Sequence, residues 1–209
     1  MAMRADARRN RDRIVAAARD LFIERGADVP MEEVAHRAGV GVGTLYRRFG
    51  DRTALQRAVA RDMAGRMRDL AESALAEEPD GWRALHRFAV RACTLRTGPL
   101  KSIIDPELNA ALRGDAELAA LEKATFAAVA AIIERAKTER TLRRDVGDGD
   151  VIMLIGRLTC SPEQLPPGLA DLAPARMVSI MLDGLRAADP TPLPGSPIGV
   201  TDLGIGSVS

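Results

Sequence analysis

Apolar residues in this chain recur every three or four positions and almost nowhere alternate with polar ones. This spacing is typical of one face of an α-helix rather than of a strand. The first such stripe consists of Ile14, Ala17, Ala18, Leu21 and Phe22. Aromatic residues make up only 3% of the chain, whereas alanine and arginine are abundant, and this composition also favours helices. The chain is therefore predicted to be all-α, with about nine helices.

Charge and hydropathy exclude several classes of protein. The chain has 30 Lys and Arg residues against 29 Asp and Glu, so its total charge indicates no partner, but residues 1–52 hold 11 arginines and only eight carboxylates. A hydrophobic content of 46% excludes a wholly disordered chain. The longest apolar run, residues 126–133, is shorter than the roughly 20 residues that cross a bilayer. Since the N-terminus also lacks a signal peptide, we expect a soluble, cytoplasmic protein.

The residues that most often carry chemistry are few. Cys93 and Cys160 cannot form a disulfide framework, and we expect them to be small buried apolar groups. Together with His36 and His86 they show no metal-ligand spacing. No paired carboxylates, phosphate-binding glycine loop or nucleophile motif indicates an enzyme. The sequence therefore predicts no catalytic residue, no metal and no cofactor.

Residues 31–49 are the most informative about function. Two short amphipathic segments on either side of a turn with two glycines, Gly39 and Gly41, predict a helix-turn-helix, whose second helix can lie in the major groove of DNA. Leu45 and Phe49 are expected to face the core. The residues left facing outward are Val42, Gly43, Thr44, Tyr46, Arg47 and Arg48. Threonine and arginine there can bind bases or phosphates, and a solvated basic face is the alternative.

The same region resembles a known family. Residues 34–55, VAHRAGVGVGTLYRRFGDRTAL, are similar to the signature of the tetracycline-repressor-type (TetR) transcriptional regulators, and residues 14–28, IVAAARDLFIERGAD, are similar to that family's first helix. The resemblance implies that Thr44, Tyr46 and Arg47 contact DNA. The resulting hypothesis is a DNA-binding transcriptional regulator, most simply a repressor that a small-molecule effector releases from its operator. The alternative is a helical protein-interaction module without sequence-specific DNA binding.

The chain departs from the family pattern at three positions. Pro30 stands where a threonine or serine is usual, and Gly41 stands where a serine is usual, so two hydroxyl groups that could touch phosphate are absent. Arg52 replaces the usual lysine and keeps its charge. The resemblance implies that Arg52 contacts a phosphate, and arginines are expected to supply the other backbone contacts.

The resemblance also implies a division of the chain. Residues 9–52 are predicted to form the DNA-binding domain, after a flexible basic arm of residues 1–8. Residues 53–187 are predicted to form a helical domain for ligand binding and dimerisation. Residues 188–209 are predicted from composition to be a disordered tail, because they hold four prolines and four glycines and lack helical periodicity. The arginines near the N-terminus could contact the minor groove of DNA or belong to a mobile, solvated terminus. They are Arg4, Arg8, Arg9, Arg11 and Arg13.

The second domain is predicted to contain six helices, at about residues 51–76, 82–97, 106–113, 115–139, 149–160 and 173–187. Candidates for an effector pocket are Trp82, His86, Thr94, Thr125, Phe126 and Arg157, although each also suits an ordinary helix position. The last two helices resemble those that pair two subunits in the family. Candidates for a dimer interface are Leu154, Leu158, Met177, Ile180, Met181 and Leu185, although each also suits the core. The implied partners are operator DNA, a second copy of the chain and an unidentified small molecule, and not a membrane.

Overall fold

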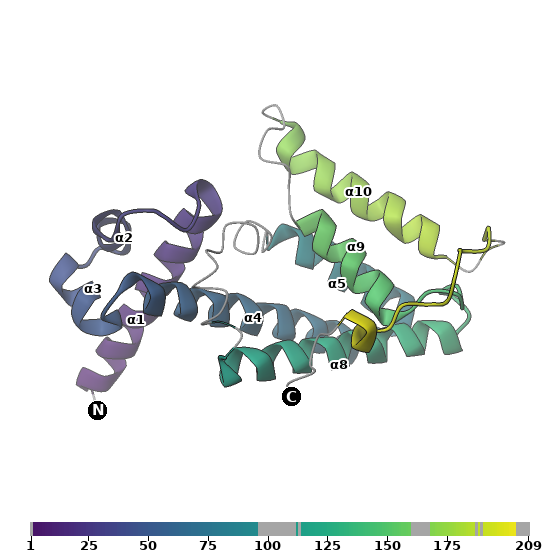
Figure 1. Ribbon diagram of the computed structural model, residues 1–209, viewed down its shortest axis with the longest axis horizontal. Helices are drawn as coiled ribbons and strands as arrows, with labels where there is room; N and C mark the ends of the chain where they lie inside the picture. The colour runs from purple at the N-terminus through teal and green to yellow at the C-terminus, as the bar shows by residue number, and fades with distance from the viewer. Residues whose placement is uncertain are drawn as a thin grey trace. The chain divides into compact units, whose positions relative to one another are not determined.

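The fold is helical throughout the part of the chain that the structure describes. The computed structural model describes residues 2–95, 112, 114–159, 168–186, 188 and 190–203. These residues form eight α-helices and one short 3-10 helix, with a single isolated bridge between Leu142 and Arg186 and no strand (Figure 1). The all-α prediction is confirmed. Of the helix predicted at 106–113, only residue 112 is among the described residues.

The helices follow the predicted order. They are α1 (Ala2–Arg25), α2 (Met31–Ala38), α3 (Val42–Phe49), α4 (Arg52–Glu77), α5 (Gly81–Thr94), α8 (Ala116–Thr138), α9 (Asp148–Thr159), α10 (Leu169–Leu185) and the 3-10 helix η1 (Val200–Leu203). α10 begins before the predicted residue 173, so that Pro174 lies inside it and one helical hydrogen bond is lost. No helix among the described residues is both long and apolar enough to span a membrane.

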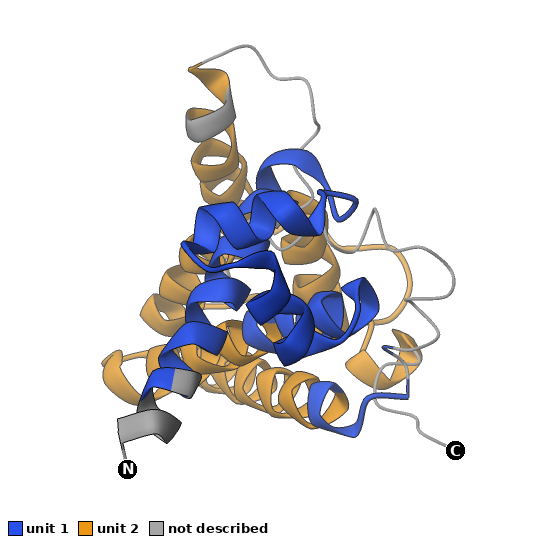
Figure 2. Ribbon diagram, turned by 90° about the vertical axis from the view of Figure 1, so that its left-hand side faces the viewer, with its two compact units in different colours: residues 1–63, 99–118 blue, residues 64–98, 119–209 orange. Residues whose placement is uncertain are grey.

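The chain forms two compact units (Figure 2). Unit 1 comprises residues 1–63 and 99–118, and unit 2 comprises residues 64–98 and 119–209. Helices α4 and α8 each begin in unit 1 and end in unit 2. The covalent chain therefore passes from one unit to the other inside two helices.

The core of unit 1 joins α1, α2 and α3 to the first turns of α4. The predicted stripe of α1 is buried, with Phe22 only 1% exposed. Leu55, Val59 and Met63 of α4 are buried in the same cluster. Because these three side chains pack with the first three helices, the unit extends to Met63 instead of ending at the predicted residue 52.

The core of unit 2 is a cluster from α5, α8, α9, α10 and the later turns of α4. Its largest fully buried side chains are Leu85, Ile132, Ile133, Leu142 and Leu182. Cys93 belongs to the same cluster, and burial raises the pKa of its thiol to about 11. It is therefore a neutral apolar group, as predicted, whereas Cys160 lies outside the described residues.

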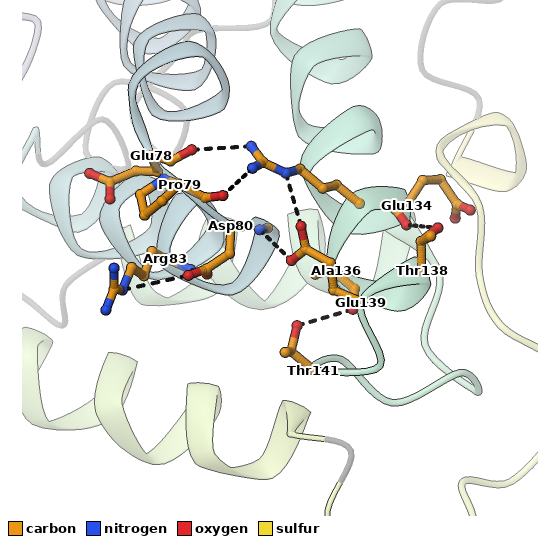
Figure 3. A network of polar contacts seen from close by, with 11 residues as sticks. Glu78, Pro79, Asp80, Arg83, Glu134, Ala136, Thr138, Glu139 and Thr141 are labelled. Atoms are coloured by element: carbon orange, nitrogen blue, oxygen red, sulfur yellow. Dashed lines mark hydrogen bonds and ion pairs between the residues drawn. The ribbon is translucent and has the colours of Figure 1, made fainter.

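The turn between α4 and α5 is held against the end of α8 (Figure 3). The Arg135 guanidinium donates to the carbonyl of Glu78 at 3.1 Å, and a Glu139 carboxylate oxygen accepts the N–H of Gly81 at 2.7 Å. A Cβ atom on Gly81 would lie 2.4 Å from the backbone nitrogen of Ala136. Glycine at this position therefore lets the start of α5 touch the backbone of α8.

Both ends of the chain differ from the prediction. α1 begins at Ala2, so residues 2–8 continue the helix instead of forming a flexible arm, in keeping with the high helix propensity of alanine and arginine. Residues 190–203 were expected to be disordered because they lack helical periodicity. They bind instead to the segment between α8 and α9 and to the first turn of α9, through hydrogen bonds that join side chains there to main-chain groups of residues 190–203. Helical periodicity does not report such bonds.

Candidate nucleic-acid interface

The turn between α2 and α3 is fixed by its own backbone. Gly39 adopts a left-handed conformation, with φ of 64°, which glycine reaches without steric cost. The N–H of Gly39 donates to the His36 carbonyl at 3.0 Å, and that of Val40 donates to the Ala35 carbonyl at 3.0 Å. These bonds satisfy carbonyls that the end of α2 would otherwise leave open. The predicted end of the first short helix at Gly39 is confirmed.

Arg13 of α1 also holds this turn. Its Nη2 atom donates to the carbonyl of Ala38 at 2.6 Å and to that of Gly39 at 3.3 Å. A Cβ atom on Gly39 would lie 2.7 Å from that nitrogen. A cation at the C-terminal end of a helix also interacts favourably with the helix dipole. Arg13 is therefore a positioning residue for the turn, whereas the sequence suggested for it only a minor-groove contact or a solvated position.

Ion pairs link α1 to its neighbours. Arg37 of α2 pairs with Glu24 at 3.0 Å and lowers the pKa of that carboxyl group. Arg19, whose side chain is 16% exposed, pairs with Asp62 of α4 at 2.9 Å. The exposed Arg37 pair contributes little to stability because water and salt screen it. α3 itself contains Arg47 and Arg48 in its last turn and no acidic residue.

α3 presents a polar and basic surface while its other side is anchored. Leu45 is fully buried, whereas Val42 is 41% and Tyr46 44% exposed. Thr44 is half-buried, and its hydroxyl accepts a hydrogen bond of 3.4 Å from Nη2 of the exposed Arg47. The remaining predicted residues, Gly43 and Arg48, are also exposed. All six residues predicted to face outward therefore lie on α3, where five are exposed and Thr44 is half-buried.

Neither helix of the motif carries a side-chain cap at its start. The cap positions are Pro30 for α2 and Gly41 for α3, and neither side chain accepts a hydrogen bond from its helix. This matches the two absent hydroxyl groups noted in the sequence. The first N–H groups of α3 have no side-chain acceptor at this cap, and such groups suit an anion such as a phosphate.

Arg52 has a structural role that the sequence did not reveal. Its Nη1 atom donates to the carbonyls of Val29 at 2.8 Å and Ala27 at 3.3 Å. The buried amide of Gln56 donates to the same Ala27 carbonyl at 3.2 Å. The first turn of α4 therefore holds the loop between α1 and α2. The expected phosphate contact of Arg52 would have to be made by the rest of its guanidinium group.

A buried carboxylate ties the start of α8 to α4 within unit 1. The side chain of Asp115 is 1% exposed, and Nε of Arg61 lies 3.0 and 2.9 Å from its two oxygens. The same carboxylate accepts the N–H of Leu118 at 3.1 Å and so caps α8. Burial acts to raise the pKa of Asp115, but the hydrogen bonds from Arg61 and Leu118 outweigh it, and the pKa is lowered. An aspartate directly before a helical segment is the one sequence signal that could have indicated this cap.

Comparisons with known proteins decide the family. Residues 14–59 match the model for bacterial regulatory proteins of the tetR family, and residues 78–187 match the model for the C-terminal domain of SbtR-like transcriptional regulators. The chain belongs to the TetR family of transcriptional regulators. The resemblance inferred from residues 14–28 and 34–55 is therefore confirmed.

Solved structures agree with this assignment. The TetR-family chain is 32% identical to a TetR transcription regulatory protein from Mycobacterium vanbaalenii, over 88% of this chain and 99% of that one, with a TM-score of 0.65. It is 29% identical to a TetR regulator from Streptomyces coelicolor, over 85% and 99% of the two chains, with a TM-score of 0.64. A curated HTH-type transcriptional regulator from Staphylococcus aureus is 46% identical over 54 residues, or 25% of this chain and 29% of that protein.

The six candidates for an effector pocket of this TetR-family protein do not share one environment. Trp82 is half-buried, and the guanidinium of Arg186 lies 4.6 Å from its ring centroid, a cation–π contact. Thr125 is buried, and its hydroxyl donates to the carbonyl of Leu121 at 2.9 Å. Phe126 is half-buried. The other three candidates, His86, Thr94 and Arg157, are exposed.

The candidate dimer interface of this TetR-family protein is largely an exposed apolar surface. Leu154 is 41% exposed, Met177 48% and Ile180 68%. Leu158 and Met181 are half-buried against the core, whereas Leu185 is 5% exposed and belongs to the core itself. Leu185 is therefore removed from the interface, because its side chain is already covered by its own subunit.

The same face contains apolar residues that the prediction omitted. In the part of the chain that the structure describes, the exposed large apolar residues of α9 and α10 are Met153, Leu154, Leu169, Leu172, Met177 and Ile180. The two helices lie side by side (Figure 1). An exposed apolar surface of this kind is typical of a protein–protein contact. We name these six residues the α9–α10 face.

Proposed function

We propose that this protein is a homodimeric repressor that binds operator DNA and leaves it when a small molecule binds. The observation that carries the proposal is the exposed surface of α3, held by a rigid turn. Main-chain bonds at Gly39 and the Arg13 guanidinium fix the turn, and Leu45 anchors the helix. A recognition helix must be held in this way, because base contacts require accurate placement. Since the proposed partner is chromosomal DNA, the protein acts in the cytoplasm.

The side chains of α3 have separate roles in this proposal. Arg47 donates to a guanine edge in the major groove, and Thr44 contacts a base edge or a thymine methyl group. Tyr46 and Arg48 contact the DNA backbone, which sets the position of the helix on the duplex. Val42 and Gly43 lie at the start of α3, where a small residue allows the DNA to approach closely.

Replacing Arg47 with alanine is expected to weaken specific binding by about 1–3 kcal/mol and to relax sequence preference at one position in each half-site. Arg52→Ala is expected to weaken binding to all sequences alike. If Arg52 also contacts a phosphate, the slope of log affinity against log salt falls by about 0.9; if it only supports the loop, the slope is unchanged. The measurement is a gel shift at several salt concentrations, with DNA from upstream of the protein's own gene and a random duplex.

The same experiment separates this function from the alternative. A helical protein-interaction module would show no preference for the upstream DNA over the random duplex. If Arg47→Ala and Arg52→Ala both bind the two duplexes as the wild type does, the assignment of α3 as the recognition helix is wrong.

The geometry of DNA supports the proposed dimer. Two recognition helices can enter successive major grooves on one side of a duplex only when they lie about 34–36 Å apart. A second copy paired through the α9–α10 face would provide the second helix. The contact would be isologous, each subunit contributing the same residues.

We further propose that α4 transmits effector binding. At about 1.5 Å per residue, its 26 residues span about 39 Å. Its first turns belong to unit 1 and its last turns to unit 2. A small tilt of a helix this long moves its end by several ångströms and changes the half-site spacing. An apolar or amphipathic ligand bound among α5, α8 and α9 would cause such a tilt.

Thermodynamic linkage supplies the test of this mechanism. An effector that weakens operator binding by some factor must itself bind more weakly by the same factor when operator is present. A ligand found by thermal-shift screening is expected to show this reciprocity in titrations with and without saturating operator. Equal affinity in the two titrations would show that the ligand is not an inducer.

A further inference from the structure

The C-terminal residues 190–203 return to the body of unit 2 after α10 (Figure 1). Arg143, which is 7% exposed, holds both the end of α10 and the start of this segment. Its N–H donates to the Leu185 carbonyl at 3.1 Å, and its guanidinium donates to the carbonyls of Gly184 at 3.2 Å and Thr191 at 2.6 Å. Arg143 therefore joins the end of α10 to the start of the C-terminal segment.

Three carboxylates then bind main-chain N–H groups of the segment. Asp145 accepts from Leu193 at 3.1 Å, Asp150 from Ile198 at 3.1 Å and Asp148 from Val200 at 3.0 Å. The guanidinium of Arg143 and the N–H of Leu193 both lower the pKa of Asp145, so this carboxylate is charged at neutral pH. Hydrogen bonds to charged acceptors are stronger than those between neutral groups.

Two glycines allow the segment to approach. A Cβ atom on Gly147 would lie 2.0 Å from the carbonyl oxygen of Ile198, and one on Gly149 would lie 2.6 Å from that of Gly199. Neither glycine is among those with positive φ, so their own backbone conformation would accept a side chain. The C-terminal segment is therefore what requires glycine at both positions.

The segment also completes the start of α9. The first N–H groups of a helix have no partner within it. The N–H of Asp150 donates to the carbonyl of Ile198 at 3.3 Å, so the C-terminal segment supplies part of the cap of α9. Met153 and Leu154 of the α9–α10 face follow within the next turn.

We infer that residues 190–203 are a strap that holds the first turn of α9 and thereby sets the strength of self-association through the α9–α10 face. The inference rests on the proposed dimer. Its physical basis is that fraying that starts in the first turn and spreads to the next would present Met153 and Leu154 in many orientations, and ordering them would then oppose association. The prolines of the segment, which restrict the unbound chain, reduce the entropy lost when it docks.

The experiment uses the full chain and approaches the contact from both sides. Gly147→Ala with Gly149→Ala places methyl groups against the strap, and Ile198→Pro removes the N–H that Asp150 accepts. Hydrogen exchange in the wild type is expected to show protected amides at Asp150, Leu193, Ile198 and Val200. Ile198→Pro has no amide at residue 198. At every other one of these positions, hydrogen exchange in both variants should be at least tenfold faster than in the wild type. Alanine has a higher helix propensity than glycine, so faster exchange in α9 would be opposite to the intrinsic effect of that substitution.

Matched controls and self-association complete the test. Gly65→Ala adds a methyl group in open space on α4, and Ile198→Ala keeps the N–H donor. In both controls these amides should exchange at the wild-type rate. Sedimentation should show a dimer dissociation constant at least tenfold higher than that of the wild type only for the two strap variants.

Wild-type amides in residues 190–203 that exchange as fast as in an unfolded chain would overturn the strap. If the strap variants show fast amide exchange but an unchanged dimer dissociation constant, the link between the strap and self-association would be overturned. A wild type that is monomeric at every concentration would overturn the dimer, and with it that link, while the exchange data still decide whether the strap exists.

Discussion

Replacing Asp115 with alanine is expected to lower the free energy of unfolding by about 3 kcal/mol, because it removes the buried carboxylate that pairs with Arg61 and caps α8. The carboxylate is 1% exposed, binds Arg61 through both oxygens and accepts the N–H of Leu118. Nε of Arg57 lies 3.8 Å from it and, in the described part of the chain, has no hydrogen-bond partner. The variant therefore loses an ion pair and a helix cap together. Urea unfolding followed by circular dichroism measures the change.

A neighbouring carboxylate provides the matched control. Glu117 pairs with the same Arg61 at 2.5 Å, but its side chain is 64% exposed, and exposed pairs contribute little. Glu117→Ala is expected to change the free energy of unfolding by no more than about 0.5 kcal/mol. Equal effects of the two substitutions would show that burial of Asp115 does not determine its contribution.

The contribution of Asp115 should also depend on pH. Its pKa is lower in the folded chain than in the unfolded chain, so folding favours the charged form. The stabilisation is complete above the unfolded pKa and is lost as the pH falls through the folded pKa. The difference in stability between the wild type and Asp115→Asn should therefore be largest near neutral pH and should shrink below about pH 4. A difference that stays constant down to the acid transition would contradict this assignment.

Leu154→Glu with Ile180→Glu is expected to abolish the dimer and to weaken operator binding by about 100-fold or more, because a monomer loses the advantage of binding two half-sites at once. The two side chains are 41% and 68% exposed, so charges there cost the isolated subunit little stability. In an apolar interface the same charges would be buried without partners. Sedimentation measures the first effect and a gel shift the second.

Two exposed alanines of α8 serve as the control. Ala127→Glu with Ala131→Glu adds the same charges outside α9 and α10 and should leave both the dimer and operator binding intact. A wild-type protein that stays monomeric at all concentrations would show that the α9–α10 face has a different role.

The sequence by itself determined the helical class, most helix positions and the helix-turn-helix. These depend on short-range features, namely apolar spacing of three and four residues and glycines that end helices. Asp51, at the predicted start of the helix over residues 51–76, directly precedes α4. The N–H of Ala54 donates to Asp51 at 2.7 Å, as an N-cap requires. The exposed face of α3 was also predictable, because burying Leu45 determines which neighbours on one helix point outward.

The tertiary structure alone decided which distant groups meet. Arg13 binds carbonyls 25 residues away, Arg61 binds a carboxylate 54 residues away, and Asp150 binds an N–H 48 residues away. Leu154 and Leu185 look alike in a helical pattern, yet one is exposed and the other belongs to the core. Periodicity reports only which residues share a face of one helix. Whether that face is buried, and which groups its polar side chains bind, depends on how the helices pack. Packing is set by contacts between segments that are remote in the sequence.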